Sequence, residues 1–228
     1  MEIKKFTVNS YKENLYVLYD ETKECVIIDC GCQTIAERFM VIDFIENHGL
    51  RPQRLLCTHY HLDHVMGNAF VSSRYGIAPE VNVGDKRLVR ILGYQAMALG
   101  IDVKIDETLI PAFSLDDGVE IRFGMSRLKV IHTPGHSPGG VSFYSRAEKI
   151  LISGDTLMKH SCGATNLPGG KAEALEASME RLFMLPSDVI VYPGHGDTTT
   201  IGAERAFHAA ERYKSNMQEA DLKAVNQD

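Results

Sequence analysis

The amino-acid sequence predicts an α/β domain built on mixed β-sheets, with helices on the outer faces. Short apolar runs typical of strands gather near the N-terminus and again after residue 118, and helical patterns lie between and after them. The 228 residues, of which 44% are hydrophobic, suffice for one sizeable core. We therefore interpret residues 1–228 as a single domain.

The first strand group is followed by a helix. The strand-like runs are Ile3–Val8, Leu15–Tyr19 and Cys25–Ile28. Turn-like segments separate these runs, which predicts antiparallel neighbours. Apolar residues at helical spacing predict a helix over Thr34–Asn47, with Thr34 as its N-cap and Gly49 just beyond its end.

The next segment carries a histidine-rich loop and then becomes harder to interpret. A short apolar run, Arg54–Cys57, leads into the loop, and Val65–Tyr75 is predicted to be a helix that stops near Gly76. Within residues 77–115, Asp85–Leu99 has a helical pattern. This part is either a helical insertion that walls a pocket or an ordinary surface excursion.

Strand signals resume in the second half of the chain. The predicted strands are Val119–Phe123, Leu128–Ile131, Gly140–Tyr144, Ile150–Ser153 and Asp188–Tyr192. Helices are predicted over Lys171–Met184 and from Gly202 to about Gln218. The resulting mixture of strands and helices is the basis of the predicted architecture.

Composition narrows the classes of function and compartment. The net charge of −6 argues against a nucleic-acid partner, because phosphate binding depends mainly on Lys and Arg. The first residues lack the apolar stretch of a signal peptide, and no run is long enough to span a membrane. The five cysteines, an odd number, mostly lie in strand-like runs, which is typical of buried reduced thiols. We expect a cytoplasmic protein without a membrane partner.

Residues 58–64 contain four potential metal ligands within a single short loop. His59 and His61 are two positions apart, so an extended segment can direct both at the same ion. Asp63 and His64 are adjacent and cannot both follow that direction unless the chain turns. The simplest arrangement is a loop at a strand end that serves two ions. Imidazole nitrogens and carboxylate oxygens suit Zn²⁺, Fe or Mn.

Three later residues can complete the two ligand sets. His136, Asp155 and His195 each follow an apolar strand-like run, as expected when a rigid scaffold presents a site on loops. A pair of ions 3.5–4 Å apart, as is typical of two-metal sites, lowers the pKa of a shared water and stabilises charge on a substrate oxygen. The pattern therefore predicts a hydrolytic site with two divalent ions, with zinc preferred and Fe or Mn as alternatives.

These motifs resemble the metallo-β-lactamase superfamily, whose signature is His-x-His-x-Asp-His followed by a distant His, Asp and His. The resemblance extends from about Asp29 to Gly196 and implies a four-layer αβ/βα sandwich, with the site at one edge between two sheets. It also implies that one ion binds to His59, His61 and His136, that the other binds to Asp63, His64 and His195, and that Asp155 bridges them. Asp63 is implied as the catalytic carboxylate that orients the water or carries a proton. Asp29 matches a family residue that braces the metal loops through hydrogen bonds.

Within the superfamily, the sequence is similar to the glyoxalase II-like hydrolases. The similarity rests on Thr-Pro-Gly-His-Ser-Pro-Gly-Gly at residues 133–140, Ser-Gly-Asp-Thr-Leu at 153–157, Leu-Pro-Gly-Gly at 167–170 and Tyr-Pro-Gly-His-Gly-Asp from residue 192. It implies hydrolysis of a small-molecule thioester, such as an acyl-glutathione, or of a related ester. The candidate substrate-binding residues are Tyr60, Lys159, His160, Asn166 and Tyr192.

The sequence departs from the glyoxalase II-like pattern at two points that bear on whether glutathione is the thiol of the substrate. Close relatives carry Gly-Arg-Ser/Thr-Asp before the Leu-Pro-Gly-Gly element, whereas this chain has Gly163-Ala164-Thr165-Asn166. Full-length glyoxalase II enzymes also add a C-terminal helical region whose basic residues bind glutathione, and the end of this chain is not rich in Lys. Glutathione is therefore a weaker expectation than the hydrolytic core.

Other functions use the same motif. In a mononuclear iron sulfur dioxygenase, His59, His136 and Asp155 would bind the iron. A lactonase or β-lactamase would use the same chemistry with a different pocket, and a metal-binding module would hold ions without turnover. Metal content and the effect of Asp63→Ala discriminate among these readings.

Overall fold

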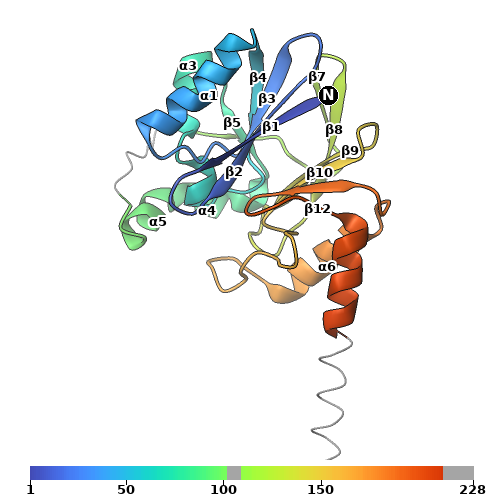
Figure 1. Cartoon of the computed structure of the whole chain (residues 1–228). Helices are drawn as coiled ribbons and strands as arrows, with labels where there is room; N and C mark the ends of the chain where they lie inside the picture. The colour runs from blue at the N-terminus through green and yellow to red at the C-terminus, as the bar shows by residue number, and fades with distance from the viewer. Residues whose placement is uncertain (102–108, 213–228) are drawn as a thin grey trace, which may run out of the picture.

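The computed structural model of the protein describes residues 1–101 and 109–212, and in it two six-stranded sheets pack face to face. The first sheet contains β1 (Glu2–Val8), β2 (Glu13–Tyr19), β3 (Glu24–Ile28), β4 (Arg51–Leu56), β5 (Pro79–Val81) and β6 (Ala112–Phe113), in that order. The second contains β12 (Thr199–Thr200), β11 (Ile190–Pro193), β10 (Ile150–Gly154), β9 (Val141–Ser145), β8 (Ser126–His132) and β7 (Glu120–Phe123). Both sheets are mixed, as predicted (Figure 1).

Strand β2 shows how the sequence builds layers on both sides of a sheet. All seven of its residues are buried. Its alternate side chains Leu15 and Val17 face a core shared with helices α1 (Ile35–Asn47) and α3 (Asn68–Tyr75). The intervening Tyr16 and Leu18 face a core between the two sheets.

The second sheet is covered in the same way on its outer side. Leu151 and Val191 pack against Leu182 and Phe183 of helix α6 (Ala172–Phe183). Ile201, the first residue of a helix over residues 201–212, joins this cluster. The layers are therefore helix, sheet, sheet, helix, which confirms the predicted αβ/βα sandwich (Figure 1).

Helix α1 begins after Thr34, as the sequence predicted. Thr34 accepts a hydrogen bond from the Glu37 backbone N–H, and the Glu37 carboxylate accepts one from the Thr34 N–H, which forms a capping box. The antiparallel β1–β2–β3 order was also predicted correctly.

Two predicted helices are interrupted. The segment predicted as one helix over Val65–Tyr75 forms α2 (Leu62–Val65) and α3. Gly67 lies at the break, where its N–H donates to the Cys30 carbonyl, and an added Cβ would lie 2.6 Å from the Cys30 sulfur. The chain leaves the helix to make this close approach, which requires glycine.

The region predicted as a helix over Asp85–Leu99 is also divided. It contains the short 3₁₀ helix η1 (Val83–Asp85), α4 (Lys86–Arg90) and α5 (Leu92–Ala98), with a break at Ile91. Part of the 77–115 segment and the end of the helix predicted to reach Gln218 lie outside the described residues.

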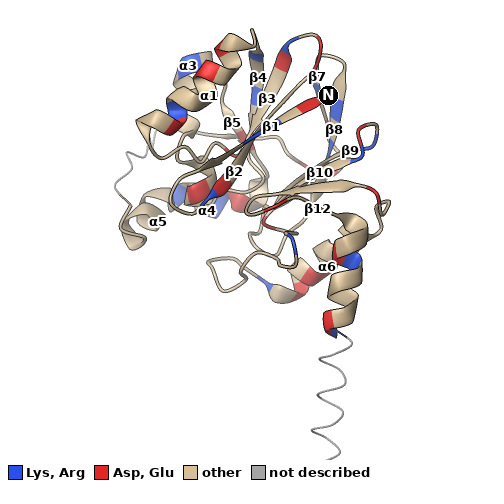
Figure 2. Cartoon of the chain, viewed as in Figure 1, with Lys and Arg blue, Asp and Glu red and all other residues tan. Residues whose placement is uncertain are grey.

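Charged residues of both signs are spread over the described chain (Figure 2). On α6, for example, Glu173, Glu176 and Glu180 accompany Arg181. All five cysteines are free; Cys162 is partly exposed and the others are buried. Among the described residues, no helix combines the length and the apolar character needed to cross a bilayer.

Candidate metal centre

Side chains from four segments meet at one edge of the sandwich. The segment of residues 57–64 follows β4 as a loop and runs into α2, and His136 follows β8. Asp155 comes directly after β10, and His195 comes shortly after β11. The strands fix the starting point of each loop, so residues far apart in the sequence are brought together.

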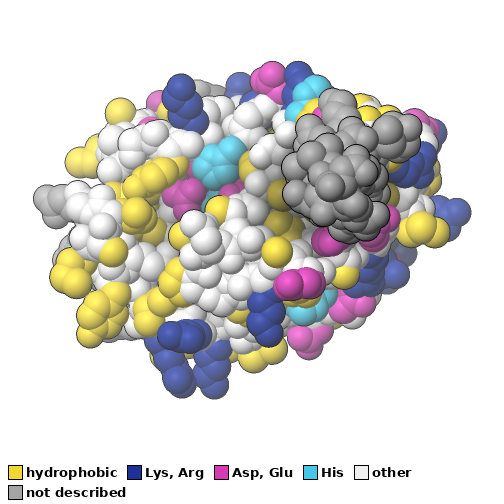
Figure 3. Space-filling view, turned by 90° about the horizontal axis from the view of Figure 1, so that it is seen from below, with side chains coloured by type: hydrophobic (Ala, Val, Ile, Leu, Met, Phe, Trp, Pro, Cys, Tyr) yellow, Lys and Arg dark blue, Asp and Glu magenta, His cyan; other side chains and the backbone are white. Residues whose placement is uncertain are grey.

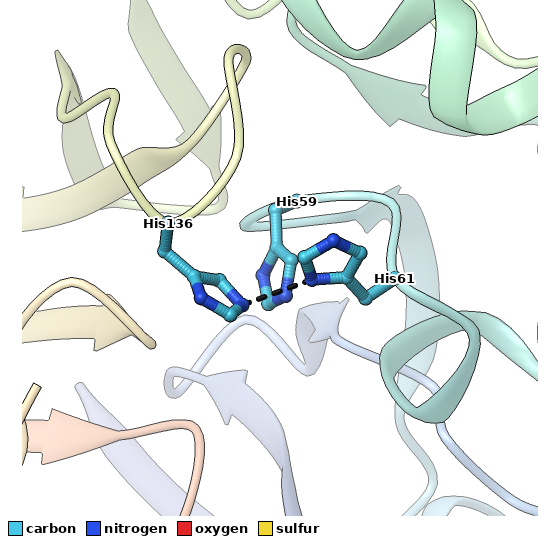
Figure 4. Close-up of side chains that lie close together, drawn as sticks. All are labelled: His59, His61 and His136. Atoms are coloured by element: carbon cyan, nitrogen blue, oxygen red, sulfur yellow. Dashed lines mark hydrogen bonds between the residues drawn. The ribbon is translucent and has the colours of Figure 1, made fainter. Parts of the chain in front are cut away.

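The first ligand group consists of His59, His61 and His136. One ring nitrogen of each lies within 4.8 Å of the others, and all three residues are buried. Figure 4 shows the three imidazoles pointing toward one another from the loops after β4 and β8. The His61 Nδ1 and His136 Nε2 atoms are 2.9 Å apart.

Hydrogen bonds at the backs of two rings orient this group. The His136 Nδ1 is 2.7 Å from the Ala164 carbonyl oxygen, so it carries the proton and leaves Nε2 as a lone-pair donor toward the cluster. The His59 Nδ1 is 3.1 Å from the Thr58 hydroxyl, and its Nε2 faces inward. Such contacts fix the tautomer that a metal requires.

The second group consists of Asp63, His64 and His195. Their ligand atoms also lie within 4.8 Å of one another. The Asp63 Oδ2 is 3.3 Å from the His195 Nε2 and 3.7 Å from the His64 Nε2. The His195 Nδ1 is anchored on the Tyr11 carbonyl oxygen at 3.1 Å.

Asp155 lies between the two groups. Its Oδ2 is 3.5 Å from the His136 Nε2 in the first group. Its Oδ1 is 3.5 Å from the His64 Nε2, and its Oδ2 is 3.7 Å from the His195 Nε2, both in the second group. This carboxylate can therefore contact two ions at once.

The donor atoms fit divalent transition-metal ions. The buried Nε2 atoms of His59, His61 and His64, and the Oδ1 of Asp155, have no hydrogen-bond partner within the described chain. Leaving such atoms unpaired costs about 1–3 kcal/mol each, a cost that a coordinated cation removes. Imidazole nitrogen and carboxylate oxygen are the ligand types of Zn²⁺, Fe and Mn sites.

The electrostatics differ between the groups. Burial, reinforced by neighbouring imidazoles, lowers the pKa of His59 well below its usual value and that of His61 to about 4, so both rings are neutral donors. Burial also acts to lower the pKa of His64, but Asp63, Asp155 and Asp29 outweigh it and raise that pKa to about 10. The carboxylates thus attract a proton to His64, and a cation would compete for the same place.

Asp29 joins the end of β3 to the metal loop. Its Oδ1 accepts a hydrogen bond from the Thr58 N–H at 2.7 Å, and its Oδ2 accepts one from the Thr58 hydroxyl at 2.7 Å. The same Oδ2 lies 3.1 Å from the His64 Nδ1. Asp29 therefore orients a ligand imidazole and the loop that carries it.

Like Asp29, Asp85 holds the ligand-bearing loops through hydrogen bonds, a role that the sequence did not reveal. It is fully buried, and its carboxylate accepts hydrogen bonds from the Tyr60 N–H at 2.9 Å, the Gly139 N–H at 2.6 Å and the Ser137 hydroxyl at 3.0 Å. Tyr60 lies between two candidate ligands, and Ser137 follows a third. Burial raises the pKa of Asp85, an effect that these hydrogen bonds oppose.

Asn14 and Tyr16 were also missed. The Asn14 N–H donates to the Gly194 carbonyl at 2.7 Å, and its side chain donates to the Pro193 and Gly196 carbonyls. The Tyr16 hydroxyl donates to the Pro193 carbonyl at 2.6 Å. Both residues lie in an apolar strand, so only the tertiary structure reveals that they hold the His195 loop.

The five residues proposed from the sequence to contact substrate do not line the cavity beside the histidines. That cavity is lined instead by residues that include Leu62, Ile91 and Leu167. Tyr60 is buried in a cluster with Cys57, Val65 and Leu88.

The other four residues lie elsewhere for different reasons. Tyr192 packs edge-on against Tyr16 between the sheets. His160 stacks on Phe207, and the Lys159 ammonium group is 3.4 Å from the Asp197 carboxylate. Asn166 is exposed, although the neighbouring Leu167 lines the cavity.

Comparisons with known proteins agree with this geometry. Residues 11–195 match the family described as the metallo-β-lactamase superfamily. A protein of Haemophilus influenzae named hydroxyacylglutathione hydrolase GloC is 34% identical over 209 residues, which cover 90% of this chain and 95% of that protein. The crystal structure of BLEG-1 B3 metallo-β-lactamase superposes with a TM-score of 0.79 and 32% identity, covering 89% of this chain and 96% of the other. The structure of TTHA1623 in a di-iron-bound form has a TM-score of 0.78 and 33% identity over the same shares.

Proposed function

Since the chain belongs to the metallo-β-lactamase superfamily, we propose that it is a metal-dependent hydrolase that cleaves a thioester or a related ester of a small molecule. The observation that carries the proposal is the convergence of seven candidate ligands, several of whose inward-facing atoms have no partner within the described chain. The similarity to a named hydroxyacylglutathione hydrolase favours a thioester.

We propose that the site holds two divalent ions, preferably zinc. His59, His61 and His136 would hold one ion, Asp63, His64 and His195 the other, and Asp155 would contact both. When bound, such ions supply a water of lowered pKa and a Lewis acid for the substrate carbonyl. The di-iron form of TTHA1623 makes iron the main alternative.

Asp63 is the proposed catalytic carboxylate. Its pKa is lowered, since His64 and the hydrogen bond from His195 outweigh the opposing effect of burial, so it is ionised near neutral pH. An ionised carboxylate at this position can accept a hydrogen bond from the attacking water and orient it. A thiol leaving group has a pKa of about 8.5, so it departs as a thiolate with little help from an acid.

Metal analysis combined with a substrate panel tests the proposal. The protein should contain about two ions per chain after reconstitution and should hydrolyse members of a panel of thioesters, lactones, β-lactams and phosphodiesters, thioesters most efficiently. Asp63→Asn should lower kcat/KM by about 10²–10⁴-fold. Asp43→Asn, on the exposed face of α1, is the matched control and should leave kcat/KM unchanged.

Each contrary result identifies a different function. A single iron per chain with oxygen-dependent consumption of a thiol would indicate a dioxygenase. Bound metal without turnover of any compound would indicate a binding module. Preferred cleavage of lactones or β-lactams would retain the hydrolase and reject the thioester.

A further inference from the structure

We propose that the cavity beside the histidine cluster is an acyl-binding pocket, which takes an uncharged apolar group of the substrate rather than a charged peptide thiol. This inference rests on the proposed function and narrows its substrate class. It depends on the chemistry of the cavity wall.

The cavity opens directly onto the candidate ligands. It has a volume of about 590 Å³, within the range of small-molecule sites, and its lining includes His61, Asp63, His136 and Asp155. Figure 3 shows histidine and acidic side chains in a depression that is bordered on one side by hydrophobic side chains. A substrate group bound in the cavity would therefore lie next to the candidate metal ligands, where the scissile bond would be placed.

Two walls of the cavity are apolar. Leu62, Ile91 and Leu99 come from the helices α2 to α5 and the turns next to them, and Met158 and Leu167 come from the loops after β10. Leu99 is 52% exposed and Leu167 is 42% exposed, so hydrophobic side chains stand at the rim in contact with water. Such a surface gains free energy when an apolar group covers it.

The amide of Gln95, one of the polar groups of the wall, is already paired. The Gln95 side-chain oxygen accepts a hydrogen bond from the Leu62 N–H at 3.2 Å, and its amide nitrogen donates to the Leu88 carbonyl at 3.4 Å. These bonds position Gln95 inside the structure and leave it little capacity for a ligand.

The described wall of this cavity carries no cationic side chain. The lining residues among the described part of the chain include neither Lys nor Arg. Lys86 and Arg90 of α4 line a second cavity, which shares Tyr94 with this one. A carboxylate placed against the apolar walls would lose hydration without gaining an ion pair. The walls therefore favour an alkyl or aryl group.

A thioester series with one uncharged thiol tests the inference. We expect kcat/KM for mercaptoethanol thioesters to rise by up to about fourfold for each methylene from acetyl to octanoyl, because each buried methylene contributes about 0.8 kcal/mol. The octanoyl thioester of glutathione should react no faster than that of mercaptoethanol. A flat series, or a more than tenfold preference for the glutathione ester, would overturn the inference while leaving the hydrolase intact.

Ligand binding separates the two proposals. Calorimetry on the metal-loaded protein should show affinity rising from acetate to octanoate, even if no ester is cleaved. If affinity rises but nothing in the series is hydrolysed, the thioester proposal fails and the pocket stands. If acetate and octanoate bind equally, the pocket assignment is wrong.

Neutral substitutions at the rim supply the structural control. Leu99→Gln combined with Leu167→Gln should weaken octanoate binding by about tenfold and leave acetate binding unchanged, because only the longer chain reaches the rim. Met97→Gln is the matched control, since Met97 lies in α5 two residues before Leu99, is 72% exposed and does not line the cavity. Equal effects of the rim and control variants would contradict the inference.

Discussion

At the scale of single residues, the candidate centre depends on the carboxylates that hold its loops as much as on those among its candidate ligands. Asp29 holds the loop after β4, and Asp85 ties that loop to the one that carries His136. Asp85 follows Asn82, whose side chain accepts a hydrogen bond from the Gly84 N–H and so closes the turn before it. The two aspartates constrain the loops from different sides.

We expect Asp85→Ala to lower both stability and metal affinity. Three buried donors, from Tyr60, Ser137 and Gly139, would lose their acceptor, and the free energy of unfolding should fall by about 2–4 kcal/mol in urea denaturation. Metal affinity, measured by competition with a chromogenic chelator, should fall by about 10–100-fold.

Two further variants make the Asp85 result decisive. Asp85→Asn keeps an acceptor oxygen and should lie between the wild type and Asp85→Ala in both measurements. Asp116→Ala removes an exposed carboxylate from a neighbouring loop and should change neither. A folded Asp85→Ala protein with unchanged metal affinity would show that the hydrogen bonds of Asp85 do not position the ligands.

The sequence was informative about residues to different degrees. The seven candidate ligands could be proposed because four of them lie within six residues and the others stand in glycine-rich motifs after strands. Asp85 and Asn14 could not, because their roles are contacts between segments distant in the chain, and each lies in an ordinary helix-start or strand pattern. The five candidate substrate-binding residues were inferred from their proximity in sequence to the candidate ligands, and none of them lines the cavity beside the histidines.

At the scale of elements, local patterns predicted those elements whose signals are local. Nine of the twelve strands of the described chain follow from apolar runs, and α1 follows from its helical spacing and its N-cap Thr34. The short strands β5, β6 and β12 were not predicted, because two or three residues carry too little pattern. The break at Gly67 lies where the chain closely approaches Cys30. The break at Ile91 lies in the wall of the cavity beside the histidines. A helical pattern alone cannot place such breaks.

The α1 capping box gives a prediction confined to stability. Thr34→Ala should lower the free energy of unfolding by about 1 kcal/mol, because the Glu37 N–H loses its acceptor at the helix start. Urea denaturation measures the change. Thr34→Ser keeps the hydroxyl and should be close to the wild type. Because α1 packs on the sheet face away from the centre, metal affinity should be unchanged in both variants. The Glu37 carboxylate also accepts a hydrogen bond from the Asn9 N–H, so a decrease in metal affinity would reveal coupling through Glu37.

At the scale of the whole molecule, the metal centre joins the two sheets. His59, His61, Asp63 and His64 follow a strand of the first sheet, whereas His136, Asp155 and His195 follow strands of the second. The sheets also share the apolar core that contains Tyr16, Phe143 and Ile152. Cations bound between the two ligand groups would add a polar link to this apolar one.

Metal removal should therefore destabilise the entire fold. With free metal at about 1,000 times its dissociation constant, binding contributes about 4 kcal/mol, which for a protein of this size corresponds to a melting temperature about 8–16 °C higher than that of the chelated form. Differential scanning calorimetry with zinc or with a chelator measures the difference. Asp155→Ala should lose most of the shift, because this side chain contacts both groups. Asp197→Ala, which removes a carboxylate that is 79% exposed near His195, should keep it. If the wild type melts at the same temperature in both conditions, the ligands do not bind a cation that links the sheets, and the basis of the proposed chemistry is lost.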